Sequence, residues 1–467
     1  MHSQGLRKCC TVFPIVSNNL KIIWKITGND LYSQYKYTDN MPQISHRGLT
    51  LPASPIRKLV PFADQAKARG VKVYHLNIGQ PDLPTPEKAL DAVRSIARKT
   101  LEYSPSQGYK SLREKFAGYY TKFGINVSPD EIIVTTGGSE ALLATFLTCF
   151  DPGDEVIITE PGYANYISFA KAAGLTIRAV TSRIEDGFTL PSAEDFEKAI
   201  TPKTKAILIC NPNNPTGYLY SAEELFRLRD IVRDHNLFLI ADEVYREFVY
   251  TDEPYVSALT LFGLDENVIV VDSVSKRYSE CGIRIGMVVT RNREVSAAIL
   301  RFCQARLSPP LLGQIAAEAS IEGTELYSRE CFDEYKARRD FFIDGLNRIP
   351  GVHTPMPQGA FYTVVSLPVE NAEDFCKWLL TDFCWKENEE EKKEDSGIHF
   401  DGPLPGPGKK GPDYAGETVM MAPAAGFYAT KGLGLNQVRM AYVLKKEDLA
   451  RALKVLVKAL VAYNSRR

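Results

Sequence analysis

Short apolar runs alternate with helix-like stretches between about Asp130 and Thr290, and this pattern restricts the fold more than any other feature of the sequence. The runs consist mostly of Ile, Val and Leu without polar alternation, which is typical of strands buried on both faces. They cover residues 132–134, 156–158, 206–209, 238–240, 268–271 and 287–289. The pattern predicts an α/β fold in which a mostly parallel sheet lies between two layers of helices.

Two helix starts support this interpretation. Ser192 is followed three positions later by Asp195, and Ser221 is followed in the same way by Glu224. A serine with an acid at this spacing is a sequence signature of a helix N-terminus. In parallel α/β sheets, ligands bind where the strands end at their carboxyl edge, so we expect the functional residues to follow the apolar runs.

The composition favours a small-molecule partner. The 56 basic and 57 acidic residues give a net charge of -1, so no overall field attracts nucleic acid or an anionic membrane. No apolar run reaches the roughly 18 residues needed to span a bilayer. The nine cysteines form no CxxC pair, and no histidine stands at zinc-finger spacing. We therefore expect a reduced cytoplasmic protein without a metal site, a nucleic-acid partner or a membrane anchor.

The most informative motif begins directly after a predicted strand. The stretch from Ser273 to Gly286 reads SVSKRYSECGIRIG. Hydroxyl groups at Ser273 and Ser275, just before Lys276, and a guanidinium at Arg284 beyond a glycine form a phosphate cradle around an amine. The aldehyde of a phosphorylated cofactor would meet that amine.

This motif, SxSKxxxxxGxRxG, resembles the lysine motif of class I/II aminotransferases, a group of fold-type I pyridoxal-phosphate enzymes that includes the aspartate aminotransferases. The likeness extends from about Met41 to Tyr463. It implies that the chain binds pyridoxal 5'-phosphate, attaches it covalently to Lys276 and uses this lysine as the general base. Ser273 and Arg284 would then bind the phosphate of the cofactor.

Further motifs in family order imply more of the cofactor site. Gly138, Ser139 and Glu140 open a helix after a strand, where amide groups and the helix dipole favour a phosphate. Tyr163 takes the place of the family's ring that stacks on the pyridine. Tyr103 matches the tyrosine that reaches the phosphate of the neighbouring subunit, so the resemblance implies a homodimer.

The remaining motifs imply the residues at the ring nitrogen and at the substrate. Asp242 ends an apolar run, where a carboxylate without a partner would be costly, so a cationic partner is expected. By resemblance this partner is the pyridinium nitrogen, while Tyr245 and Asn214 hydrogen-bond the phenolic oxygen. The substrate would contact Asn214 and Gly79, and Arg439 would bind its α-carboxylate through a bidentate pair.

The length of the chain leaves room for a second domain, because single cores rarely grow beyond about 250–300 residues and this chain has 467. We predict a large cofactor-binding domain and a smaller α+β domain. We expect the N-terminal extension to be poorly ordered or to reflect the choice of start site, and an acidic, Gly/Pro-rich stretch to form a mobile insertion. The boundaries are 1–40 for the extension, 41–80 and 319–467 for the small domain, 81–318 for the large domain and 386–416 for the insertion.

The resemblance implies an enzyme of amino acid metabolism that moves an amino group from an L-amino acid to a 2-oxo acid in a ping-pong reaction. Overall similarity favours aspartate as the donor and 2-oxoglutarate as the acceptor. Some aspartate-using relatives have a lysine in the segment where this chain has Ser139, so the partner of the distal carboxylate stays unassigned, and Arg306 is one candidate. Aromatic amino acids, alanine and prephenate are alternative substrates.

Three other interpretations stay open. A carbon–sulfur lyase, a decarboxylase or a cyclase of the aminocyclopropane-carboxylate type on the same fold would use nearly the same residues. A regulator that only senses its ligand would need a DNA-binding domain, for which 40 N-terminal residues without a helix-turn-helix pattern are too few. A nucleotide-binding doubly wound enzyme would need a GxGxxG fingerprint followed by an acid, which the sequence lacks.

Overall fold

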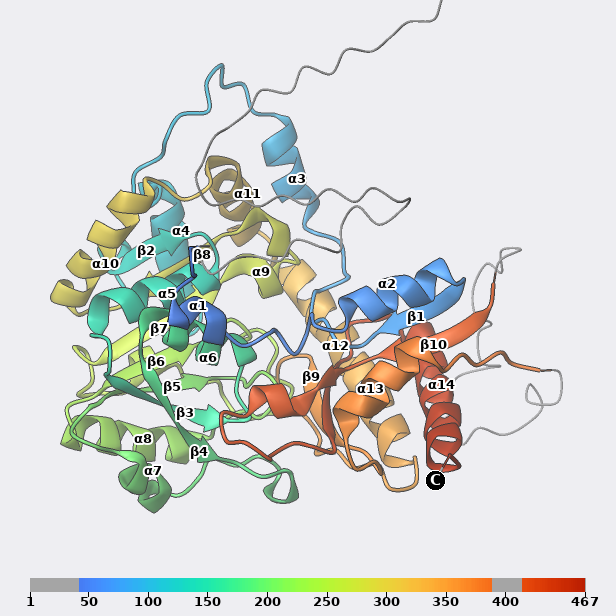
Figure 1. Ribbon diagram of the computed structural model, residues 1–467. Helices are drawn as coiled ribbons and strands as arrows, with labels where there is room; N and C mark the ends of the chain where they lie inside the picture. Colours follow the sequence, from blue (N-terminus) through green and yellow to red (C-terminus); the bar gives the residue numbers. More distant parts are fainter. Residues whose placement is uncertain (1–41, 389–413, 467) are drawn as a thin grey trace, which may run out of the picture. The chain divides into compact units, whose positions relative to one another are not determined.

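The computed structural model describes residues 42–388 and 414–466 (Figure 1). Residues 47–388 and 414–466 belong to one compact unit, and the site described below lies entirely within it. The predicted N-terminal extension lies outside the described residues, as does most of the predicted insertion. Both therefore stay predictions.

A seven-stranded sheet with the order β2-β8-β7-β6-β5-β3-β4 contains all six predicted apolar runs (Figure 1). Neighbouring strands from β4 to β7 run parallel, and β8 is antiparallel to both of its neighbours. The strands are β2 (Ile132–Thr135), β3 (Glu155–Glu160), β4 (Thr176–Thr181), β5 (Thr204–Cys210), β6 (Phe238–Asp242), β7 (Val268–Ser273) and β8 (Gly286–Val289).

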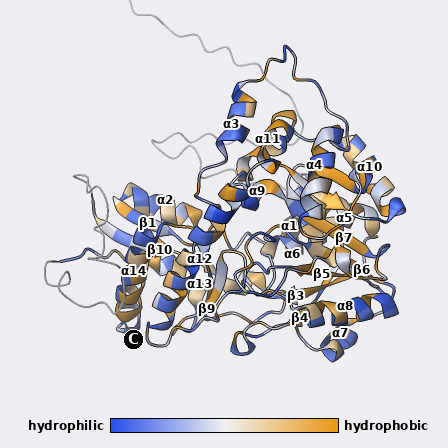
Figure 2. Cartoon of the chain, turned by 180° about the vertical axis from the view of Figure 1, so that it is seen from behind, coloured by the Kyte–Doolittle hydropathy of each residue, from blue (hydrophilic) through white to orange (hydrophobic). Residues whose placement is uncertain are grey.

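Alternate residues of the central strands pack on opposite faces of the sheet, which explains why the apolar runs show no polar alternation. In β5, Ala206 and Leu208 belong to one buried core, and Ile207 and Ile209 belong to the other. Figure 2 shows the central strands coloured as hydrophobic, with hydrophilic residues on the outer sides of α7 and α8. The predicted three-layer architecture is confirmed. One layer contains α5 (Gly138–Cys149), α6 (Ala164–Ala173) and α10 (Arg293–Arg306), and the other contains α4 (Lys110–Thr121), α7 (Ala193–Ala199) and α8 (Ala222–Asp234).

Both predicted helix starts are N-caps. The Ser192 hydroxyl accepts a hydrogen bond from the Asp195 amide at 3.3 Å, and the Ser221 hydroxyl accepts one from the Glu224 amide at 3.2 Å. In each case the acid accepts a bond from the serine amide in return. These reciprocal pairs satisfy amide groups that would otherwise lack a partner in the first turn, so the local sequence determines where α7 and α8 begin.

Two smaller sheets and their helices form the α+β part of the molecule. β1 pairs in parallel with β10, and β11, β12 and β9 form an antiparallel sheet in that order. The mixture confirms the predicted smaller α+β part, while the boundaries at residues 80 and 318 stay predictions. Its elements are α2 (Val60–Ala68), β1 (Val71–His75), α12 (Glu325–Asn347), β9 (Tyr362–Ser366), α13 (Ala372–Thr381), β10 (Gly416–Met420), β11 (Ala422–Pro423), β12 (Gln437–Ala441) and α14 (Lys446–Asn464).

Four further helices lie between these elements in the chain. Within residues 42–388 and 414–466, no helix combines the length and the apolar composition required to cross a membrane. The connecting helices are α1 (His46–Thr50), α3 (Glu87–Arg94), α9 (Val274–Arg277) and α11 (Leu311–Ile321).

Candidate active site

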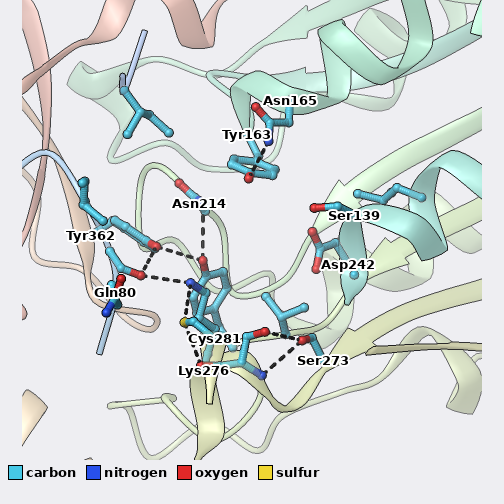
Figure 3. Close-up of a pocket in the computed structure, with 18 of the residues that line it drawn as sticks. Gln80, Ser139, Tyr163, Asn165, Asn214, Asp242, Ser273, Lys276, Cys281 and Tyr362 are labelled. Atoms are coloured by element: carbon cyan, nitrogen blue, oxygen red, sulfur yellow. Dashed lines mark hydrogen bonds between the residues drawn. The ribbon is translucent and has the colours of Figure 1, made fainter. Parts of the chain in front are cut away.

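A cavity of about 650 Å³ opens at the carboxyl ends of the central strands (Figure 3). Asp242 is the last residue of β6, Ser273 is the last of β7, and Asn214 follows β5. Gly79, which follows β1, and Arg439 in β12 complete the cavity from the smaller sheets. The cavity thus lies between the two parts of the molecule, at the edge where the sequence pattern predicts it.

Most of the predicted site residues line this cavity, but two do not. Glu140 accepts a hydrogen bond from the Thr136 amide at 2.6 Å and pairs with Arg306 at 3.3 Å, and Tyr103 is 75% exposed. Arg306 also donates to the Val134 carbonyl oxygen at 3.2 Å and lies outside the cavity, so the structure does not support it as a substrate residue. The predicted residues that do line the cavity are Gly79, Gly138, Ser139, Tyr163, Asn214, Asp242, Tyr245, Ser273, Lys276, Arg284 and Arg439.

Lys276 projects into the cavity from α9, the short helix that follows β7. Its Nζ donates a hydrogen bond to the Gly79 carbonyl oxygen at 3.0 Å and lies 3.8 Å from Cys281 Sγ (Figure 3). Ser273 caps this helix, because its hydroxyl accepts a hydrogen bond from the Ser275 amide at 3.1 Å. The lysine side chain is half-buried and makes no ion pair with a described residue that would hold its amine away from a ligand.

A buried ion network fixes the backbone on both sides of Lys276. Asp272 pairs with Arg277 and, at 3.0 Å, with Arg246, and it accepts a hydrogen bond from the Tyr120 hydroxyl at 2.8 Å. Burial alone would raise the pKa of Asp272, but the Arg277 and Arg246 guanidinium groups outweigh it and lower that pKa. The network therefore holds an ionised carboxylate four residues before the lysine and a cation directly after it.

Asp242 is a buried carboxylate that lacks a cation. Its Oδ2 accepts a hydrogen bond from the Tyr166 hydroxyl at 2.6 Å, while its Oδ1 has no hydrogen-bond partner among the described residues. Burial raises the pKa of Asp242 to about 6, although the Tyr166 hydrogen bond opposes the rise. A positively charged group placed in the cavity against Oδ1 would relieve this cost.

The start of α5 and Arg284 form a part of the cavity that suits an anion. Helix α5 begins at Gly138 and directs its positive dipole end toward the cavity. Gly137 has a φ of 78°, and a Cβ at this position would collide with the Arg284 guanidinium. Glycine is favoured here because residues with a side chain rarely adopt this positive φ.

Arg439 is a buried cation that lacks an anion. Its Nη1 donates to Asn214 Oδ1 at 3.1 Å and its Nη2 donates to the Asn77 carbonyl oxygen, while its Nε has no partner among the described residues. Burial lowers the pKa of Arg439, and no carboxylate contributes to raising it. A carboxylate entering the cavity would supply the missing counter-charge.

Three polar side chains link this arginine to the rest of the site (Figure 3). The Tyr245 hydroxyl accepts a hydrogen bond from Asn214 Nδ2 at 3.4 Å and donates to the Tyr362 hydroxyl at 3.0 Å. Tyr362 in turn donates to the Gly79 carbonyl oxygen at 3.2 Å, and its ring lies 4.6 Å from the Arg439 guanidinium. Tyr362 had no sequence signal, because it belongs to no recognisable motif and reaches the site only through the fold.

The sequence of the chain matches the family described as Aminotransferase class I and II over residues 71–385. The chain belongs to this family. It is 33% identical to the aspartate aminotransferase of Thermotoga maritima over 331 residues, which cover 70% of this chain and 86% of that protein. It is 32% identical to the aspartate/prephenate aminotransferase of Thermus thermophilus, with 68% and 84% covered. The solved structure of the alanine aminotransferase from Pyrococcus furiosus superposes with a TM-score of 0.76 at 29% identity, covering 90% of this chain and all of the other.

The protein is therefore an aminotransferase, and family members of the aspartate aminotransferase type use pyridoxal phosphate. The cavity fits this cofactor. Asp242 offers an unsatisfied carboxylate oxygen for a protonated ring nitrogen, and the α5 N-terminus with Arg284 suits a phosphate. Lys276 supplies a primary amine for the aldehyde.

Proposed function

We propose that this aminotransferase takes the amino group of L-aspartate and delivers it to 2-oxoglutarate in a ping-pong reaction at Lys276. The observation that carries the proposal is the pair of buried, oppositely charged groups without counter-ions, Asp242 and Arg439, in one cavity with the lysine amine. One of them suits the cofactor ring and the other suits the carboxylate of an amino acid. An amino acid would thus be held with its Cα near the amine.

Asp242 and Lys276 have different roles in the proposed reaction, one at the cofactor ring and one at the substrate proton. Pyridoxal phosphate, when bound, supplies a pyridine ring that accepts the electron pair left behind when an amino acid loses its α-proton. Asp242 keeps a proton on the ring nitrogen, because its buried carboxylate needs a cation. Lys276 carries the α-proton as general base and then returns it as general acid.

The other residues orient the two ligands. Arg439 binds the α-carboxylate, with Asn214 and the Asn77 carbonyl oxygen holding the guanidinium in place. Asn214, Tyr245 and Tyr163 line the cavity and would hold the cofactor when it is bound, the first two through hydrogen bonds to its phenolic oxygen and Tyr163 through its ring. In these roles the hydrogen-bonded pair of Asn214 and Tyr245 would couple the substrate end of the cavity to the cofactor end.

The substrate assignment is tested by a panel of amino acids. The named relatives act on aspartate, prephenate and alanine, and their similarity to this chain is nearly equal. We expect aspartate to give the fastest spectral change of the bound cofactor in the first half-reaction, and 2-oxoglutarate to reverse it. If the enzyme converts only alanine or only an aromatic amino acid, aspartate is not its amino donor. Product formation without any requirement for a 2-oxo acid would instead indicate a lyase or a decarboxylase.

We propose further that the enzyme is a homodimer in which Tyr103 reaches the cofactor phosphate of the neighbouring subunit. Its high exposure in the single chain supports this role. Replacing Tyr103 by Phe should weaken cofactor affinity about tenfold, because one hydrogen bond to a charged group is lost. The control is Leu101→Ala, a change at an exposed neighbour without a hydroxyl. Sedimentation should give twice the mass of one chain. A monomer, or equal cofactor affinities for the Tyr103 variant and wild type, would refute the proposal.

A further inference from the structure

Four cationic side chains line the cavity, and the proposed function uses three of them. In the proposed function, Lys276 reacts with the cofactor aldehyde, Arg284 binds the cofactor phosphate and Arg439 binds the α-carboxylate of the substrate. The fourth is Arg57. Among the described residues that line the cavity, Asp242 is the sole carboxylate, so none is left to neutralise this arginine. A cation without an assigned anion therefore remains in the site.

Arg57 comes from a turn that is linked to the substrate clamp. The Arg57 amide donates to the Ser54 carbonyl oxygen at 3.1 Å, which closes the turn. Within this turn the Ile56 carbonyl oxygen accepts a hydrogen bond from Asn77 Nδ2 at 3.0 Å. The Asn77 carbonyl oxygen accepts a bond from Arg439. The turn and the clamp thus share one asparagine as a common anchor.

The positive charge of Arg57 affects the pKa of Tyr163, which also lines the cavity. Burial raises the pKa of Tyr163 to about 12, and the positive charges of Arg439 and Arg57 both oppose this rise. Both guanidinium groups line the same cavity as this tyrosine. Arg439 is buried and Arg57 is exposed, and both line the cavity, so one cavity contains a buried cation and an exposed cation.

The next residue, Lys58, is also a cation, but it has an ion-pair partner and lies outside the cavity. Lys58 pairs with Glu373 at 2.6 Å and does not line the cavity. The Arg57 guanidinium makes no ion pair or hydrogen bond with any residue of the described chain. Ser139 lines the cavity but carries no charge, and Arg306 pairs with Glu140 outside it.

We infer that Arg57 binds the distal carboxylate of a dicarboxylic amino acid whose α-carboxylate is held by Arg439. The inference rests on the proposed function and gives it a specificity residue. A planar guanidinium suits this task, because it binds a carboxylate through two parallel hydrogen bonds.

The test compares two variants of adjacent cations in the cofactor-loaded, full-length enzyme. Arg57→Gln removes the charge in the cavity, and Lys58→Gln removes the neighbouring charge outside it. Single-turnover rates are measured with L-aspartate and with L-alanine, which lacks a distal carboxylate. We expect Arg57→Gln to lower kcat/KM for aspartate by about 10- to 100-fold, the effect of a lost charge-assisted hydrogen bond. Alanine should react at nearly the wild-type rate, and Lys58→Gln should change neither value.

A binding measurement without turnover supports the kinetic test. Calorimetric titration with succinate should show a loss of affinity in Arg57→Gln similar to the loss for aspartate, whereas butyrate, which has a single carboxylate, should bind as it does to wild type. Arg57→Lys should restore part of the succinate affinity, because it keeps the charge but loses the fork geometry. A structural defect would instead weaken both ligands together.

The outcomes separate this inference from the proposed function. Equal losses for aspartate and alanine, or no loss for either, would overturn the role of Arg57. If wild type converts alanine but not aspartate, the inference fails while the aminotransferase reaction stands. If no amino acid is converted, the proposed function fails, and the succinate titration alone decides whether Arg57 binds a second carboxylate.

Discussion

Replacing Lys276 by Ala should abolish transamination while leaving the fold intact. The loss should reach about 10⁴-fold or more, because one amine serves both as the attachment point and as the general acid–base group. The structural cost should be small. Lys276 is half-buried and its amine makes a single short hydrogen bond, to the Gly79 carbonyl oxygen. Its removal should change the free energy of unfolding by about 1 kcal/mol or less.

The matched control is Lys276→Arg, which keeps a cation in the cavity but offers no primary amine. It should be as inactive as the alanine variant. The measurements are turnover, the unfolding midpoint and peptide mapping of the wild-type enzyme after borohydride reduction, which should place the cofactor label on the peptide that contains Lys276. A label on a different lysine, or substantial turnover by either variant, would show that the attachment site lies elsewhere.

Replacing Asp242 by Asn should cause the second-largest loss of activity. The substitution should weaken cofactor binding in the loaded enzyme, whereas it should stabilise the cofactor-free protein. In the loaded enzyme a buried cation loses its counter-charge, so cofactor affinity should fall by about 100-fold or more and turnover should fall with it. Tyr166→Phe is the control, because it removes the hydrogen bond to Oδ2 but leaves the carboxylate. The control should retain most of the affinity. Unchanged cofactor affinity in the asparagine variant would contradict the role of Asp242.

In the cofactor-free protein the same substitution should increase stability at neutral pH. Burial raises the pKa of Asp242 from 3.8 to about 6, so the neutral form is favoured in the folded state. The protonated Asp242 carboxyl contributes fully to the free energy of unfolding below about pH 4, and this contribution is lost as the pH rises through about 6. Wild type should therefore become less stable than Asp242→Asn by up to about 3 kcal/mol across this interval. Denaturant titrations of both proteins between pH 4 and 8 would measure the difference, and parallel stability curves would disprove it.

The central sheet was predictable where strands are buried on both faces, and not elsewhere. Every apolar run became a strand, but β4 was missed. It reads TIRAVT and lies at the sheet edge, where most of its residues stay partly exposed and Arg178 is tolerated. The antiparallel direction of β8 was not predictable either, because an apolar run reads the same in both directions.

The active site was predictable to the extent that its residues follow strands or belong to local motifs. Glu140 belongs to such a motif, yet its side chain lies outside the cavity. Successive helix residues point about 100° apart, so the residue after Ser139 faces a different side of α5. Tyr362 and Arg57 lie in the cavity, although the sequence analysis assigned neither of them to the site. Their positions depend on how the smaller sheets meet the central one, and this cannot be derived from spacing in the sequence.

The residues that line the cavity extend along the chain from Ser54, near the beginning of the folded unit, to Arg439, near its end. During synthesis the substrate clamp is therefore among the last parts of the site to be made, long after the lysine has emerged. Until β12 has been made, Asp242 and Lys276 lack Arg439 as a neighbour in the cavity. Binding of the substrate carboxylate should therefore require nearly the whole polypeptide.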